Sequence, residues 1–266
     1  QMIQFKKMPL TYTVMAICII VFLCIHFLPL GMNSTNMAIL FGAYYKAFIS
    51  AGEIWRLLTV GFVHIELWHL VMNMAALYTL GSVLEKYYGS FRFGIILALS
   101  TITGSLVSFI GEGNTLMVGL SGGLYGLMAA EIMMIIKSGL LQSQAIRRSL
   151  IQTLLINLCI NFMPGIGVLA HFGGFLIGIL LSFAFDVYAL DLHMQKTYRI
   201  CTICLLCVLC VFACKRKAIN ENDIYLGTDI AILQFEKDHH LGWYVDKMTT
   251  KLEKLYNIDT IHYYLH

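Results

Sequence analysis

Four polar residues with reactive or hydrogen-bonding side chains lie in or beside long apolar runs: His69, Asn73, Ser121 and His171. A polar side chain within a membrane is energetically unfavourable, so one that persists there marks a candidate functional site. His69 and Asn73 are four residues apart and therefore share one face of a helix. Because a serine hydroxyl is a weak nucleophile at neutral pH, Ser121 needs a base, and His171 is the obvious candidate.

The segment before Ser121, residues 111–120, lacks a helical pattern, whereas the apolar run after it reads as a helix. Irregular backbone at membrane depth is tolerated only where protein covers it or where it lines water. A helix that begins at Ser121 leaves its first amides without partners and places the positive end of its dipole there. Such a helix start can bind the oxyanion formed when a serine attacks a carbonyl, and Asn73 and His69 could donate to the same oxygen.

The imidazole of His171 has no carboxylate placed to orient it. Glu131 follows Ser121 by ten residues, which is about 15 Å along a helix axis at 1.5 Å per residue. We therefore expect a Ser–His dyad whose imidazole is oriented by packing, with Tyr125, one turn below Ser121, as the ring best placed for it.

The composition places these residues in a membrane protein. The chain of 266 residues is 59% hydrophobic and 12% charged, with mean hydropathy +0.76, whereas soluble domains are about 25% charged. Seven apolar runs predict helices over residues 10–30, 64–84, 93–110, 120–137, 148–163, 167–187 and 199–214. The fifth and seventh are shorter than the roughly 20 residues that a bilayer requires.

We expect an all-α polytopic membrane protein in three parts. Residues 1–190 form a six-helix catalytic core, residues 191–214 a seventh transmembrane helix, and residues 215–266 a polar C-terminal tail. A net charge of +3 gives no reason to expect a nucleic-acid partner.

Basic residues at the ends of the apolar runs set the predicted orientation. With a cytoplasmic N-terminus, one group of them lies inside: Lys86, Arg92, Lys137, Arg147, Arg148, Lys196 and Arg199. The four candidate residues then lie near the outer face. Lys215-Arg216-Lys217 opposes this rule if residues 199–214 cross completely, and we favour crossing.

Small residues spaced four apart form a stripe on each of two predicted helices: Gly122, Gly126 and Ala130 on one, Ala170, Gly174 and Gly178 on the other. Membrane helices that approach closely do so through such stripes. Since Ser121 precedes the first stripe and His171 follows Ala170, packing of the stripes is expected to bring the two side chains within hydrogen-bonding reach.

Four segments follow one another in a fixed order: Glu53-Ile-Trp55-Arg56, His64-x4-His69-x3-Asn73, Gly119-Leu-Ser121-Gly-x-x-Tyr125 and Ala170-His171-x-x-Gly174. Together they resemble the rhomboid family of intramembrane serine proteases, over roughly residues 10–187. The resemblance implies a six-helix core, to which some members add a seventh helix. It also implies structural rather than catalytic roles for Trp55, Arg56 and His64.

The same resemblance implies a role for each polar residue of the candidate site. Ser121 is the expected nucleophile and His171 its base. His69, Asn73 and the Ser121 amide are expected to bind the oxyanion, and Tyr125 to stack on His171.

The resemblance also implies the class of reaction and its setting. The expected activity is endopeptidase cleavage of transmembrane protein substrates in the lipid bilayer, without a cofactor or a metal. The compact core and the lack of an organellar presequence predict a bacterial cell membrane. The sequence carries no signal for an oligomeric state.

Three other chemistries fit the sequence less well. Gly119-x-Ser121-x-Gly123 fits the nucleophile elbow of soluble hydrolases, but that motif needs a strand before it. His64 and His69 are five residues apart, about 140° round a helix, which does not suit a zinc site. The spacing Cys204-x2-Cys207-x2-Cys210-x3-Cys214 resembles that of iron–sulfur ligands, but on a continuous helix it indicates packing.

The serious alternative is not an enzyme. A rhomboid-like protein that binds membrane clients, or a small transporter, would share the helices. Such proteins usually lack the serine or the histidine, and this sequence has both.

Overall fold

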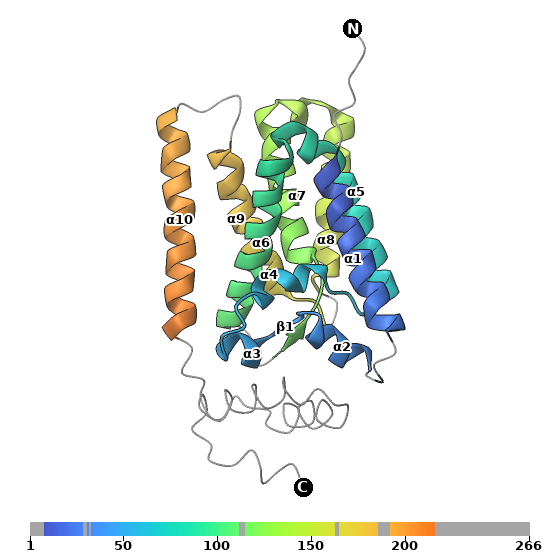
Figure 1. Cartoon of the computed structure of the whole chain (residues 1–266). Helices are drawn as coiled ribbons and strands as arrows, with labels where there is room; N and C mark the ends of the chain where they lie inside the picture. The colour runs from blue at the N-terminus through green and yellow to red at the C-terminus, as the bar shows by residue number, and fades with distance from the viewer. Residues whose placement is uncertain are drawn as a thin grey trace.

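The computed structural model describes residues 8–28, 31, 33–111, 115–162, 165–185 and 192–215, with side chains in the last segment for residues 197 and 199–209. The predicted tail beyond residue 215 lies outside the described residues. Within them, seven long helices are present (Figure 1): α1 Pro9–Phe27, α5 Leu67–Tyr88, α6 Ser90–Gly111, α7 Ser121–Lys137, α8 Gln144–Ile160, α9 Val168–Ala184 and α10 Leu192–Lys215. The predicted all-α membrane fold is confirmed.

Several helix boundaries differ from the predicted ones, and two helices begin earlier because polar residues extend them beyond their apolar runs. Helix α8 begins at Gln144 rather than residue 148, and α10 begins at Leu192 rather than residue 199. Helix α10 has 24 residues in all, but its described apolar part, Arg199–Leu209, is shorter than the roughly 20 residues that a bilayer requires, in agreement with the short seventh apolar run. Helix α5 begins at Leu67 rather than residue 64, so His64 precedes it.

By length and composition, three described helices can each cross a membrane: α1, α5 and α6. Helix α9 is apolar but shorter, with 17 residues. Helix α10 lies at one side of the bundle and packs against α9 and α6, as Figure 1 shows.

Short elements fill the long loop after α1 and the segment before α7. They are α2 Ser34–Leu40, β1 Tyr44–Tyr45, α3 Lys46–Ser50, α4 Arg56–Thr59, the 3-10 helix η1 Val60–Phe62 and β2 Leu116–Met117. A second 3-10 helix, η2 Leu140–Gln142, lies between α7 and α8. Strands β1 and β2 pair antiparallel, Tyr44 with Met117 and Tyr45 with Leu116. This ladder fastens the segment before Ser121 to the loop, which gathers at one end of the bundle (Figure 1).

A buried arginine organises that loop. Arg56, only 2% exposed, donates through Nε to the Glu53 carboxylate at 2.7 Å. Its Nη1 donates to the backbone carbonyls of Ile39 at 2.7 Å and Ala43 at 2.9 Å. A buried charge must be paired and hydrogen-bonded, so this guanidinium holds α2 and the residue that precedes β1 against α4. The neighbouring Trp55 is exposed.

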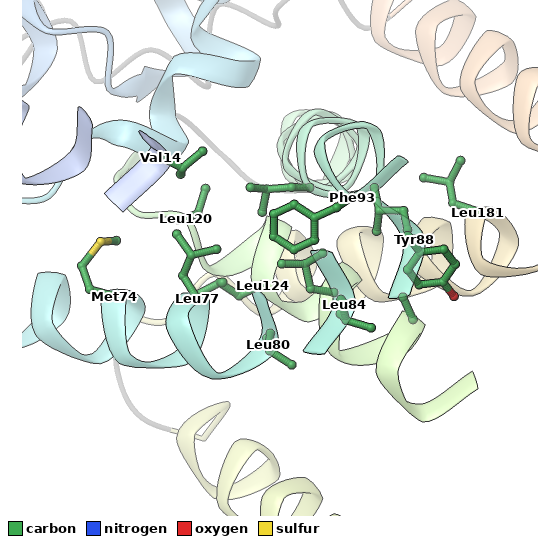
Figure 2. Close-up of a cluster of buried hydrophobic side chains, with 14 of the residues drawn as sticks. Val14, Met74, Leu77, Leu80, Leu84, Tyr88, Phe93, Leu120, Leu124 and Leu181 are labelled. Carbon is green, nitrogen blue, oxygen red and sulfur yellow. The ribbon is translucent and has the colours of Figure 1, made fainter. Parts of the chain in front are cut away.

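The apolar core lies between α1, α5, α6, α7 and α9 (Figure 2). Its buried members include Val14, Leu77, Leu84, Phe93, Leu124 and Leu181, which Figure 2 labels. Since lipid is as apolar as these side chains, the close fit among them, rather than exclusion of water, holds the helices together.

A carboxylate on α5 caps the start of α1. Glu85 Oε2 accepts from the Thr11 amide at 2.8 Å and the Thr11 hydroxyl at 2.6 Å, while Oε1 accepts from the Leu10 amide at 2.9 Å and the Ser90 hydroxyl at 2.6 Å. The N-cap residue of α1, Met8, makes no side-chain cap of its own. Glu85 therefore supplies the partners that the first amides of α1 lack.

We predict that Glu85→Ala lowers the thermal unfolding midpoint in detergent, because each buried donor left without a partner costs about 1–3 kcal/mol. Ser90→Ala removes one of the four hydrogen bonds and should lower the midpoint less. An unchanged midpoint in Glu85→Ala would show that this carboxylate does not hold α1 to α5.

Candidate active site

Ser121 and His171 lie at the starts of α7 and α9 and face each other. Nε2 of His171 is 2.9 Å from Oγ of Ser121, although 50 residues separate them in the sequence. His171 is 5% exposed, so the contact is largely shielded from solvent. A nucleophile and its base need this hydrogen-bonding distance.

The small-residue stripes lie where α7 and α9 touch. A methyl group at Gly174 would contact the backbone oxygen of Gly122 and lie 2.8 Å from its carbonyl carbon, and one at Gly178 would contact the backbone oxygen of Gly126. A side chain at these positions would force the two helices apart. The glycines thus permit the approach that places His171 beside Ser121.

Helix α6 joins the same contact through a third stripe that sequence reasoning missed. Small residues spaced four apart on α6 are buried: Ser100, Gly104 and Ser108. A methyl group at Gly104 would lie 2.5 Å from the backbone oxygen of Ala170, and one at Gly126 would contact the Ser100 side chain. The four-residue spacing is the signal that could have revealed this stripe.

Tyr125 stacks on the imidazole of His171. The ring centroids are 4.0 Å apart and the planes differ by 10°. Tyr125 lies one turn below Ser121 on α7, and its ring covers one face of the His171 imidazole.

The histidine has one further partner, which sequence reasoning missed. Oδ1 of Asn161 lies 2.6 Å from Nδ1 of His171, so the expectation that packing alone orients the imidazole was wrong. Asn161 is the residue that caps the end of α8. Since α8 runs opposite to α7, its end lies level with the start of α7. An asparagine at the end of the predicted fifth helix was the available signal.

The proposed oxyanion donors lie beside the segment that leads into Ser121. A methyl group at Gly119, whose φ is +112°, would lie 2.6 Å from Cε1 and 2.7 Å from Nε2 of His69. Glycine permits both this backbone conformation and the approach of the ring. Asn73, which is 5% exposed, donates through Nδ2 to the His69 backbone carbonyl at 2.9 Å. One N–H of its carboxamide remains for another acceptor.

His64 packs against the ring of His69. It is completely buried, and its ring meets that of His69 edge-on at 5.2 Å. Burial, reinforced by the neighbouring His69, lowers the pKa of His64 to about 4. His64 is therefore neutral at physiological pH and acts as a packing group.

Metal ligands do not gather at this site. Among the described residues, no three His, Cys, Asp or Glu side chains are grouped so that they could hold a metal ion. Cys204 and Cys207 are exposed on the surface of α10, so the packing expected for them does not occur within the described bundle; the side chains of Cys210 and Cys214 lie outside the described residues.

Comparison with known proteins covers the part of the chain that contains these residues. The family model of the rhomboid domain matches residues 51–186, about half of the chain. This range includes every residue of the candidate site.

Named relatives include both a protease and an inactive protein. Rhomboid protease GluP of Bacillus subtilis (strain 168) is 32% identical over 182 residues, which cover 68% of this chain and 36% of GluP. RHOMBOID-like protein 5 of Arabidopsis thaliana is 35% identical over 146 residues, 53% of this chain and 47% of the relative. Inactive RHOMBOID-like protein 8 of the same plant is 32% identical over 149 residues, 55% of this chain and 42% of the relative. The chain spans about half the length of these curated relatives or less.

We predict that Gly174→Leu separates α7 from α9 and lowers catalytic turnover about a hundredfold, the effect expected when a nucleophile and its base shift by about 1 Å. Membrane insertion should persist, because leucine favours the bilayer. Gly167→Ala, at the N-cap of α9, is the control, since its methyl group would make ordinary contacts of 3.5 and 3.6 Å. Full activity in Gly174→Leu would contradict the role given to the stripes.

Proposed function

Because this chain belongs to the rhomboid family, we propose that it is an intramembrane serine endopeptidase that cleaves transmembrane segments of membrane proteins. The observation that carries the proposal is the 2.9 Å separation of Ser121 Oγ and His171 Nε2. The burial of His171 and the stacking of Tyr125 on its imidazole support it.

The proposed reaction begins with attack of Ser121 Oγ on the substrate carbonyl carbon. His171 Nε2 takes the hydroxyl proton and returns it to the leaving amine, which departs and leaves an acyl-enzyme. Water, deprotonated by His171, then attacks the ester carbonyl; the bond to Ser121 Oγ breaks, His171 returns the proton to Ser121, and the carboxylic acid product departs. These reaction steps use no cofactor.

Stabilisation of the tetrahedral intermediate is assigned to three groups. The amide of Ser121 lies in the first turn of α7, where backbone N–H groups lack intrahelical partners. The free N–H of Asn73 and the ring of His69 are the proposed side-chain donors. Donors fixed before the reaction need no reorganisation when charge develops, which is why such sites accelerate acyl transfer.

We also propose a location and an orientation. Basic residues at the ends of the helices favour a cytoplasmic N-terminus, which places the start of α7 and the site toward the outer side. A bacterial cell membrane is the proposed location, supported by the similarity to the Bacillus subtilis protein over 68% of this chain.

The second candidate function is binding of membrane clients without catalysis. It is considered because one relative is named Inactive RHOMBOID-like protein 8. Labelling by a serine-reactive fluorophosphonate separates the two functions. A protease should react at Ser121, and a binding protein should not.

We predict that Ser121→Ala and His171→Ala each abolish cleavage of a model single-span membrane substrate while the protein remains inserted and folded. The two residues act as one unit, so the double variant should be no worse than either single variant. Ser82→Ala is the control, because that hydroxyl donates only to its own helix, to the Thr79 carbonyl at 2.8 Å. Substantial cleavage by Ser121→Ala would rule out the proposed mechanism.

We predict that Asn73→Ala lowers kcat about tenfold to a thousandfold, the range for loss of one oxyanion donor, with less change in KM. Steady-state kinetics on the same substrate provide the measurement. A raised KM at unaltered kcat would make Asn73 a substrate contact instead.

A further inference from the structure

A continuous chain of hydrogen bonds runs from the end of α8 to Ser121. Tyr125 Oη lies 3.2 Å from the backbone oxygen of Asn157, and Asn161 Nδ2 lies 3.0 Å from Tyr125 Oη. Asn161 Oδ1 lies 2.6 Å from His171 Nδ1, and His171 Nε2 lies 2.9 Å from Ser121 Oγ. This series of hydrogen bonds joins α8, α7 and α9.

The direction of every bond in this chain follows from its first member. A backbone carbonyl only accepts, so the Tyr125 hydroxyl donates to Asn157. The tyrosine oxygen then accepts from the NH₂ of Asn161, which turns the Asn161 carbonyl oxygen toward His171. Nδ1 of His171 must therefore carry the proton and donate it. Nε2 is left unprotonated and accepts from the Ser121 hydroxyl.

We propose that Asn161 is a positioning residue that fixes the reactive tautomer of His171, an inference that rests on the proposed protease function. Its carboxamide oxygen holds the Nδ1–H form and stabilises the imidazolium that exists after the Ser121 proton has moved. The role is that of the third member in a Cys-His-Asn or Ser-His-Asp site.

The location of Asn161 makes this tautomer depend on α8. Among the described residues, α8 buries no side chain. In the part of the chain that the structure describes, the side-chain hydrogen bonds that join α8 to α7 and α9 involve the Asn157 backbone carbonyl and the Asn161 carboxamide. When α8 packs against α7 and α9, Oδ1 of Asn161 is in place to accept the hydrogen bond from His171 Nδ1.

Tyr125 consequently has two separable functions. Its ring stacks on His171, and its hydroxyl sets the orientation of the Asn161 amide. Tyr125→Phe removes the second function and keeps the first, which provides a test that does not alter Asn161 itself.

The experiment compares Asn161→Ala, Asn161→Asp and Tyr125→Phe with wild type, in cleavage of a model single-span substrate and in fluorophosphonate labelling. Asn161→Ala should lower kcat about tenfold to a hundredfold at unchanged KM, the range for one hydrogen bond to a charged group. Tyr125→Phe should lower kcat about two- to tenfold, as for a neutral hydrogen bond. Labelling should slow in the same order.

Asn161→Asp provides the readout that a merely structural residue would not give. The carboxylate restores the acceptor and favours the imidazolium, so the acidic limb of kcat/KM against pH should move to higher pH. An unmoved acidic limb would overturn the proposal, and this holds even if Asn161→Ala fails to fold. The matched control is Gln152→Ala, which removes an exposed carboxamide from the same helix and should leave the kinetics unchanged.

The outcomes separate this inference from the proposed function. A wild type that neither cleaves nor labels overturns the protease function and this inference with it. An active wild type and an inactive Ser121→Ala, together with an Asn161→Ala of normal kcat or of raised KM alone, overturn only the role of Asn161.

Discussion

The close approach of the α7 and α9 backbones is the contact on which the arrangement of polar residues depends. Gly174 faces the Gly122 carbonyl and Gly178 faces the Gly126 carbonyl, so main chain meets main chain. In lipid this approach is stabilised by packing itself rather than by removal of apolar surface from water. Because Ser121 and His171 sit at the first turns of these two helices, their separation of 2.9 Å is set by the helix contact.

Much of the fold and part of the site could be predicted from the sequence, because a membrane restricts the structures and roles that apolar and polar residues can have. Apolar runs identify helices, since a spanning backbone must satisfy its own hydrogen bonds. A serine and a histidine beside two glycine stripes then indicate which helices touch. These signals are local, because each is a spacing of residues within one helix. The structure brings Ser121 and His171 together at one end of the bundle, as expected.

The features that sequence reasoning missed have weak sequence signals, because their roles depend on how the helices are arranged around one another. Asn161 contacts His171 because the end of α8 and the start of α9 lie side by side, and a spacing of ten residues in the sequence gives no such information. The α6 stripe of Ser100, Gly104 and Ser108 has the same period as the others but carries no reactive residue to draw notice. Helix ends were also misplaced, because hydropathy marks where a helix is apolar rather than where its backbone stops.

The chemistry of the third partner of the histidine follows from its surroundings. An ionised side chain that is shielded from water carries a desolvation cost, whereas a carboxamide carries no charge. A neutral acceptor has a drawback, since an amide can turn and present its NH₂ instead. The hydroxyl of Tyr125, held by the Asn157 carbonyl, removes that freedom by accepting from the NH₂. A buried polar network specifies one arrangement only when each member is satisfied. In this site the backbone carbonyl of Asn157 can only accept a hydrogen bond, and this determines the donor in each of the other hydrogen bonds up to Ser121.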